Sequence, residues 1–172
     1  MMGYLMVGAM VVISTTFAAA SLGKLRDLPG FRASLRGLVP GRTLALTAVL
    51  VPTAELITVA AFIATLVDRR ASVIGFGLAA VLLAAFTVGV AVAIRKDGAA
   101  RCHCFGRQGA VLSTRHVIRN VFLLGVALAG LAGRGAFGDV DPAGAAIAVI
   151  CALWVAANVI FMDEIIALFG GP

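Results

Sequence analysis

Five long runs of apolar residues divide this chain of 172 residues. A helix of roughly 20 apolar residues can cross a hydrocarbon core about 30 Å thick. Such a helix is apolar on every side, so it must be buried or lie in lipid. With 62% hydrophobic residues, the chain is far more apolar than a soluble domain, which is about half apolar. The sequence therefore predicts an all-α membrane protein, a single bundle of about five transmembrane helices.

The expected spans lie in one transmembrane domain over residues 1–172, and they are residues 3–22, 43–67, 72–94, 116–132 and 143–160. The first run also resembles a signal peptide, because three small residues, Ala18 to Ala20, end it like a cleavage site. No Lys or Arg precedes the run, whereas a signal peptide needs a positive first region. We therefore expect a retained first helix.

Most of the basic residues lie in the connectors between the apolar runs, and 14 Lys and Arg against 8 Asp and Glu give a net charge of +6. Basic connectors beside membrane spans set topology and meet anionic lipid, so we expect a lipid bilayer as partner and no nucleic acid. All but Arg69, Arg70 and Arg134 lie in the connector after the first span or in the region from Arg95 to Arg119, which includes the connector after the third span and the first turn of the fourth. The positive-inside rule places these two connectors in the cytoplasm of a multi-pass plasma membrane protein.

Local patterns predict how the spans begin and pack. Ser72 is a candidate cap for the third span, and Asp141 followed by Pro142 is a start signal for the fifth. Small residues recur every fourth position and favour close helix packing, although chance spacing is easy in a chain rich in alanine. They are Gly125, Ala129 and Gly133 in the fourth span, and Ala148, Ala152 and Ala156 in the fifth.

The first connector carries apolar residues at helical spacing: Leu28, Phe31, Leu35 and Leu38. They indicate either a short amphipathic helix on the membrane surface, from Pro29 to about Pro40, or an ordinary basic loop.

The third connector concentrates the chemistry visible in the sequence, since it contains Cys102, His103 and Cys104. Cysteines two residues apart project to the same side of an extended segment, so their sulfurs could approach one another. A disulfide across one residue closes a small ring, and strained, exposed bridges tend to be catalytic or regulatory. Positive charge from Arg101 and His103 favours the thiolate.

These features support a hypothesis of thiol-disulfide exchange. Either Cys102 or Cys104 attacks, the other resolves, and His103 exchanges the proton. The chain would then be a membrane thiol-disulfide oxidoreductase component, with a thioredoxin-like protein or a disulfide-bearing client as partner. No cofactor is assigned; a quinone is a conceivable electron acceptor that no motif requires.

Other readings of the same residues stay open. Cys-His-Cys can offer soft ligands to zinc or copper, but a closed zinc site needs about four ligands, and we assign no metal site. The cysteines could also be palmitoylated or be inert packing residues in a non-catalytic scaffold or small-ligand binder. Cys151, inside the fifth span, is expected to be a packing residue.

Glu55 lies near the middle of the second span, three residues after Pro52. An ionisable residue within a membrane normally faces the bundle interior and has a partner. The candidates are Lys24, Arg119, Asn120 and Asn158. The result would be either a proton or ligand site, or a buried pair that fixes the packing of the helices.

Several of these motifs coincide with a known pattern. They are Lys24-x-x-Asp27-x-x-x-Phe31, Pro52-x-x-Glu55, Cys102-x-Cys104-Phe105-Gly106 and Arg119-Asn120. Together they resemble the MauE family of integral membrane proteins, named for methylamine utilisation and related to DoxX-like proteins, over nearly the whole chain. The resemblance implies a role in maturing methylamine dehydrogenase, whose small subunit is rich in disulfides, and an association with thioredoxin-like proteins. It also implies that Cys102 and Cys104 are the functional thiols and that Glu55 and Lys24 support them.

The resemblance and the charge rule disagree about the side of the membrane. Disulfide maturation takes place outside the cytoplasm, where thiols are not kept reduced. The distribution of Lys and Arg places the Cys-x-Cys connector inside. Either electrons are collected inside, or the basic connectors lie within the bundle and do not follow the rule.

Overall fold

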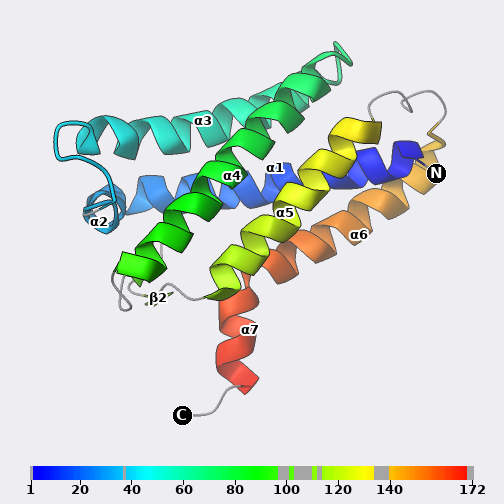
Figure 1. The fold of residues 1–172 in the computed structure, drawn as a ribbon. Helices are drawn as coiled ribbons and strands as arrows, with labels where there is room; N and C mark the ends of the chain where they lie inside the picture. Colours follow the sequence, from blue (N-terminus) through cyan, green and yellow to red (C-terminus); the bar gives the residue numbers. More distant parts are fainter. Residues whose placement is uncertain are drawn as a thin grey trace.

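Seven helices account for most of the chain in the computed structural model, which describes residues 2–36, 38–96, 101–102, 110–111, 114–133 and 140–169. The helices are α1 (Met2–Arg26), α2 (Leu28–Ser34), α3 (Leu44–Ala64), α4 (Ala71–Lys96), α5 (Thr114–Ala132), α6 (Pro142–Ile160) and α7 (Met162–Phe169) (Figure 1). Two short strands, β1 (Arg101–Cys102) and β2 (Ala110–Val111), pair antiparallel between α4 and α5.

Five of these helices, α1, α3, α4, α5 and α6, are long and apolar enough to cross a membrane. The predicted all-α membrane protein with five spans is therefore confirmed. The Cys-x-Cys connector is described only at its two ends, where Arg101 pairs with Val111 and Cys102 with Ala110. Residues 103–109, which include His103, Cys104, Phe105 and Gly106, lie outside the described part of the chain.

The first apolar run forms α1, the helix around which the other spans assemble. α1 packs against α3, α5 and α6, and α4 packs against α3 and α5. Four spans thus close a ring in the order α1, α3, α4, α5, and α6 lies along α1 (Figure 1). The end of α1, the start of α3, the end of α4 and the start of α5 share one end of the bundle (Figure 1).

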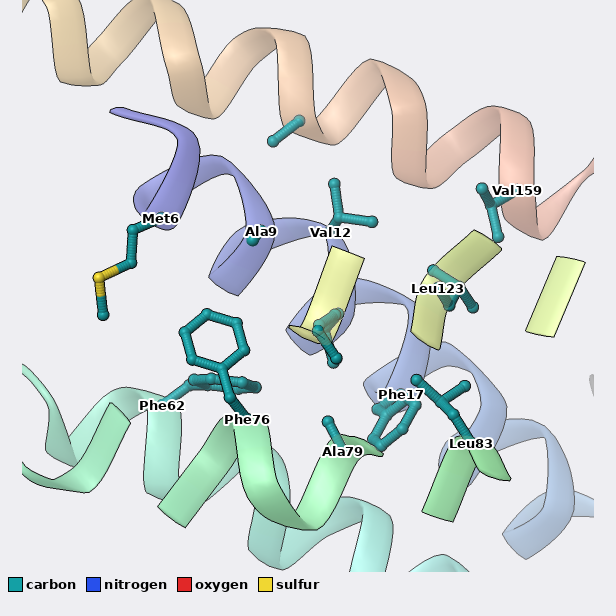
Figure 2. Packing of buried hydrophobic residues seen from close by; sticks show 13 residues of the cluster. Met6, Ala9, Val12, Phe17, Phe62, Phe76, Ala79, Leu83, Leu123 and Val159 are labelled. Carbon is teal, nitrogen blue, oxygen red and sulfur yellow. The ribbon is translucent and has the colours of Figure 1, made fainter. Parts of the chain in front are cut away.

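The core of the ring is built from large side chains of all four helices (Figure 2). Phe62 of α3 and Phe76 of α4 meet edge to face, with ring centroids 4.9 Å apart. Met6 and Phe17 of α1, Leu83 of α4 and Leu123 of α5 belong to the same core. Such interlocking matters in lipid, because packing rather than the exclusion of water brings the helices together.

Side-chain caps set several helix starts. Gly144 N–H donates to Asp141 Oδ2 over 3.0 Å, and Pro142 begins α6, so the start signal of the fifth span is confirmed. The predicted cap at Ser72 is wrong. α4 begins one residue earlier, at Ala71, and the Ser72 hydroxyl instead donates to the Arg69 carbonyl.

The first connector contains a helix, α2, whose N-terminus is capped by Asp27. Gly30 N–H donates to Asp27 Oδ1 over 3.0 Å. The helix buries Phe31 and exposes Arg32, as an amphipathic helix does. It ends at Ser34, well before the predicted end near Pro40, because the chain turns from Leu35 onward.

The small-residue positions of the two last spans behave differently. Ala152 and Ala156 of α6 are buried, and a Cβ added at Gly8 of α1 would lie 4.0 Å from the Ala152 Cβ. On α5 the predicted face is wrong for two of three residues, because Gly125 and Ala129 are exposed. α5 instead packs through another face, which carries Leu123, Ala127 and Gly130.

Candidate functional site

A buried ion pair joins the last turn of α1 to the middle of α3. The Lys24 ammonium donates to Glu55 Oε1, and the two side chains are 4% and 1% exposed. Taking two charges out of water is expensive, so each member of such a pair depends on the other. Of the four candidate partners for Glu55, the structure brings Lys24 to it.

Aromatic rings complete the surroundings of the ammonium group. Lys24 Nζ lies 5.7 Å from the ring centroid of Phe31 and 5.2 Å from that of Phe86. A cation within about 6 Å of an aromatic face is attracted to the ring quadrupole. The positive charge of Lys24 is therefore held by groups from α2, α3 and α4 together.

A second polar contact between α1 and α3 lies one helical turn from the ion pair. The Ser21 hydroxyl donates to the Pro52 carbonyl over 3.0 Å, and both residues are buried. Pro52 has no N–H and cannot donate the usual helical hydrogen bond. Ser21 therefore pairs with Pro52, and Lys24, three residues later on α1, pairs with Glu55, three residues later on α3. The two contacts together fix how the two helices cross.

The first turns of α5 bring more polar side chains into the bundle. His116, Arg119 and Asn120 are all buried. Asp163 of α7 approaches two of them, with Oδ2 3.5 Å from His116 Nε2 and 3.9 Å from Arg119 Nη1. α7 turns away from α6 and thereby places an acid beside the start of α5 (Figure 1).

A cavity of about 370 Å³ opens between these groups. Lys24, Glu55, His116, Arg119 and Asn120 contribute its larger polar side chains. Most of the remaining wall is apolar and includes Phe17, Phe31, Leu83, Phe86 and Leu123. The ring of four spans thus encloses a space that is largely apolar and has a cluster of polar groups in its wall.

Four of the predicted supporting residues gather at one place: Lys24, Glu55, Arg119 and Asn120 all line this cavity. β1, which contains Arg101 and Cys102, has its backbone beside α2, and α2 also contributes to the cavity wall. The other thiol-site residues, from His103 to Gly106, fall outside the described part of the chain.

Two sequence expectations about the fifth span are wrong. Asn158 is exposed and donates to the Trp154 carbonyl of its own helix, so it does not reach Glu55. Cys151 is a free cysteine that is exposed on α6 rather than packed in the bundle. Both residues lie on the side of α6 that α1 does not cover, whereas Ala152 and Ala156 face α1.

His116 and Asp163 were not predicted as site residues, although the structure brings them together. Each is an ionisable residue at the boundary of an apolar run: His116 opens the fourth and Asp163 follows the fifth. The spans of the bundle alternate in direction, so the start of the fourth apolar run and the end of the fifth lie at the same end. This shared end is the sequence signal that could have brought His116 and Asp163 together. In the part of the chain that the structure describes, no group of three His, Cys, Asp or Glu side chains gathers as a metal site would require.

The fold and the site together define a class of multi-pass helical membrane protein, with a buried Lys–Glu pair beside a cavity in a ring of four spans. The family model described as methylamine utilisation protein MauE matches residues 2–133, and the chain belongs to this family. The match covers α1 to α5 and so includes all four spans of the ring, while α6 and α7 lie beyond it. No curated protein and no solved structure matches the chain.

Proposed function

We propose that this membrane protein exchanges thiols and disulfides with a partner protein through Cys102 and Cys104, as part of disulfide-dependent maturation of the methylamine-utilisation type. One observation carries the proposal. β1 is extended at Cys102, and it lies beside α2 at the end of the bundle where the buried polar groups gather. An extended backbone favours a shared direction for side chains two residues apart, which a helix would not provide.

The exchange conserves atoms and electrons between the two proteins. One thiolate attacks a sulfur of the partner's disulfide and forms a mixed disulfide. The second cysteine then attacks the bridge, which leaves a Cys102–Cys104 disulfide and releases the partner as a dithiol. His103 takes the proton from the attacking thiol and returns it to the departing thiolate. A thioredoxin-like dithiol reverses the same steps and restores the pair.

The proposed setting is the plasma membrane, with the Cys-x-Cys connector on the cytoplasmic side. The argument is the concentration of Lys and Arg in the first and third connectors. An impermeant thiol reagent should then reach Cys102 and Cys104 only after the membrane is opened. Labelling of both thiols in intact cells would place the connector outside.

Trapping of mixed disulfides tests the exchange. Cys102→Ser and Cys104→Ser each remove one thiol, and one of the two variants should accumulate a covalent complex because resolution is blocked. The complex is isolated from membranes without reductant, and the partner is identified after reduction.

The chain offers its own control, because Cys151 is exposed on α6 and remains in every variant. A variant with both Cys102→Ser and Cys104→Ser should lose the partner and keep only adducts made through Cys151. If this double variant retains the same partner, the exchange does not depend on the Cys-x-Cys pair.

A further inference from the structure

The steps of the thiol exchange proposed above use no side chain of the cavity inside the ring of four spans. Its volume, about 370 Å³, lies in the range of roughly 300–1,000 Å³ that is typical of small-molecule sites. All four spans of the ring contribute to its wall, and α2 with the stretch that follows it, from Leu35 to Val39, closes one side. Because these helices stand in lipid, a molecule dissolved in the membrane has the shortest route to it.

Glu55 supplies an unsatisfied hydrogen-bond acceptor in the cavity wall. Oε1 accepts from Lys24, but Oε2 is buried and has no hydrogen-bond partner among the residues that the structure describes. A buried acceptor without a donor costs free energy, and a bound O–H group would remove that cost. The wall therefore favours a ligand with a hydrogen-bond donor.

The charges around the cavity disfavour a charged ligand. Lys24 is compensated by the Glu55 carboxylate and by the faces of Phe31 and Phe86. His116 and Arg119 both approach the Asp163 carboxylate. Since the cations already face anions of the same chain, a phosphate head group would gain little here. The rest of the wall is mostly apolar and suits a hydrocarbon body.

We propose that this cavity binds a lipid-soluble molecule with an apolar body and a neutral, hydroxyl-bearing polar end, whose hydroxyl donates to Glu55 Oε2. Two classes of membrane-soluble molecule have this chemistry and are the candidate sources of the ligand. One is a redox carrier in its quinol form, and the other is a lipid alcohol without redox activity. Binding does not rest on the thiol exchange proposed above, so a variant with Cys102→Ser and Cys104→Ser should bind as the wild type does.

The probe is 4-decylphenol with a photoreactive diazirine in its alkyl chain, added to the protein in phosphatidylcholine nanodiscs. Mass spectrometry should find saturable labelling of cavity residues such as Phe17, Leu83 and Phe86. Unlabelled 4-decylphenol should compete about tenfold better than 4-decylanisole, which lacks the O–H donor, because one hydrogen bond corresponds to roughly that factor. A decyl quinol and oleyl alcohol, used as further competitors, distinguish the two sources.

Two glycines of α4 provide matched variants. A Cβ at Gly89 or at Gly77 would meet nothing within 4 Å, but only Gly89 lines the cavity. Gly89→Leu should fill part of the cavity and reduce labelling by about tenfold, while Gly77→Leu should leave it unchanged. Glu55→Gln should remove the preference for the phenol over the anisole.

Three results would overturn the proposal. The first is labelling that does not saturate and is confined to the lipid-facing side chains. The second is equal labelling of the Gly89→Leu variant and the wild type. The third is equal competition by the phenol and the anisole. Because none of these measurements involves a cysteine, their outcome is separate from that of the trapping experiment.

Discussion

Lys24 and Glu55 depend on each other because a single buried charge without its partner is costly inside the bundle. The sequence alone indicates that Glu55 needs a partner, since an ionisable side chain within a span rarely faces lipid. It does not indicate which of four polar residues fills that role, because the choice depends on which helix faces meet. The structure answers through α1, whose last turn places Ser21 and Lys24 against α3.

Replacement of one member of the pair should therefore lower the free energy of unfolding more than replacement of both. Lys24→Met or Glu55→Leu alone leaves a buried charge uncompensated, and we expect either to lower the free energy of unfolding by about 3 kcal/mol. The double variant Lys24→Met, Glu55→Leu should recover most of that loss, because an apolar pair needs no compensation. Unfolding in mixed detergent micelles, analysed as a double-mutant cycle, gives the coupling.

Arg26→Met is the matched control for this cycle, because Arg26 is exposed on the same helix. This substitution should leave the free energy of unfolding nearly unchanged. If the double variant is as unstable as the sum of the two single variants, Lys24 and Glu55 do not act as a pair.

At the scale of the helix, α5 shows why the small-residue pattern misled. A spacing of four residues identifies a face, but it does not say whether that face meets protein or lipid. Gly125 and Ala129 are exposed, whereas Gly130 lies against the ring of Phe76. In a span where both environments are apolar, small residues on the two faces look alike in the sequence.

Substitution by alanine should lower the stability of the protein at Gly130 and raise it at Gly125. A Cβ at Gly130 would lie 2.3 Å from two atoms of the buried Phe76 ring, so Gly130→Ala should destabilise the protein by about 1–3 kcal/mol. A Cβ at Gly125 meets nothing within 4 Å, and Gly125→Ala should stabilise α5 by up to about 1 kcal/mol through helix propensity. Thermal unfolding in detergent measures both; equal stability of the two variants would contradict this packing of α5 on α4.

For the whole molecule, the number of spans follows from the sequence because each apolar run has the length of a bilayer crossing. The arrangement of the spans does not follow. Ile57 and Phe62 belong to the same apolar run, yet Ile57 is 53% exposed and Phe62 is buried in the ring. Hydropathy cannot separate a lipid-facing side chain from a core side chain, since lipid is as apolar as the core.

Only part of the candidate site could likewise be predicted from the sequence. Lys24, Glu55, Arg119 and Asn120 could be named from their residue types and from the MauE resemblance, and the structure places all four around one cavity. The cavity arises only when the four spans of the ring and α2 are assembled, and the approach of Asp163 to His116 arises only when α7 is placed against the start of α5. Such contacts join distant parts of the chain and leave no local pattern.

The central claim is that Cys102 and Cys104 form one reversible redox pair, and a redox titration tests it most directly. The purified Cys151→Ser variant in nanodiscs is equilibrated with graded ratios of reduced and oxidised glutathione, and free thiols are counted by a mass tag. We predict that both tags disappear together in a single two-electron step and return on reduction. Retention of both tags at every ratio, or the separate loss of each to glutathione, would contradict the claim.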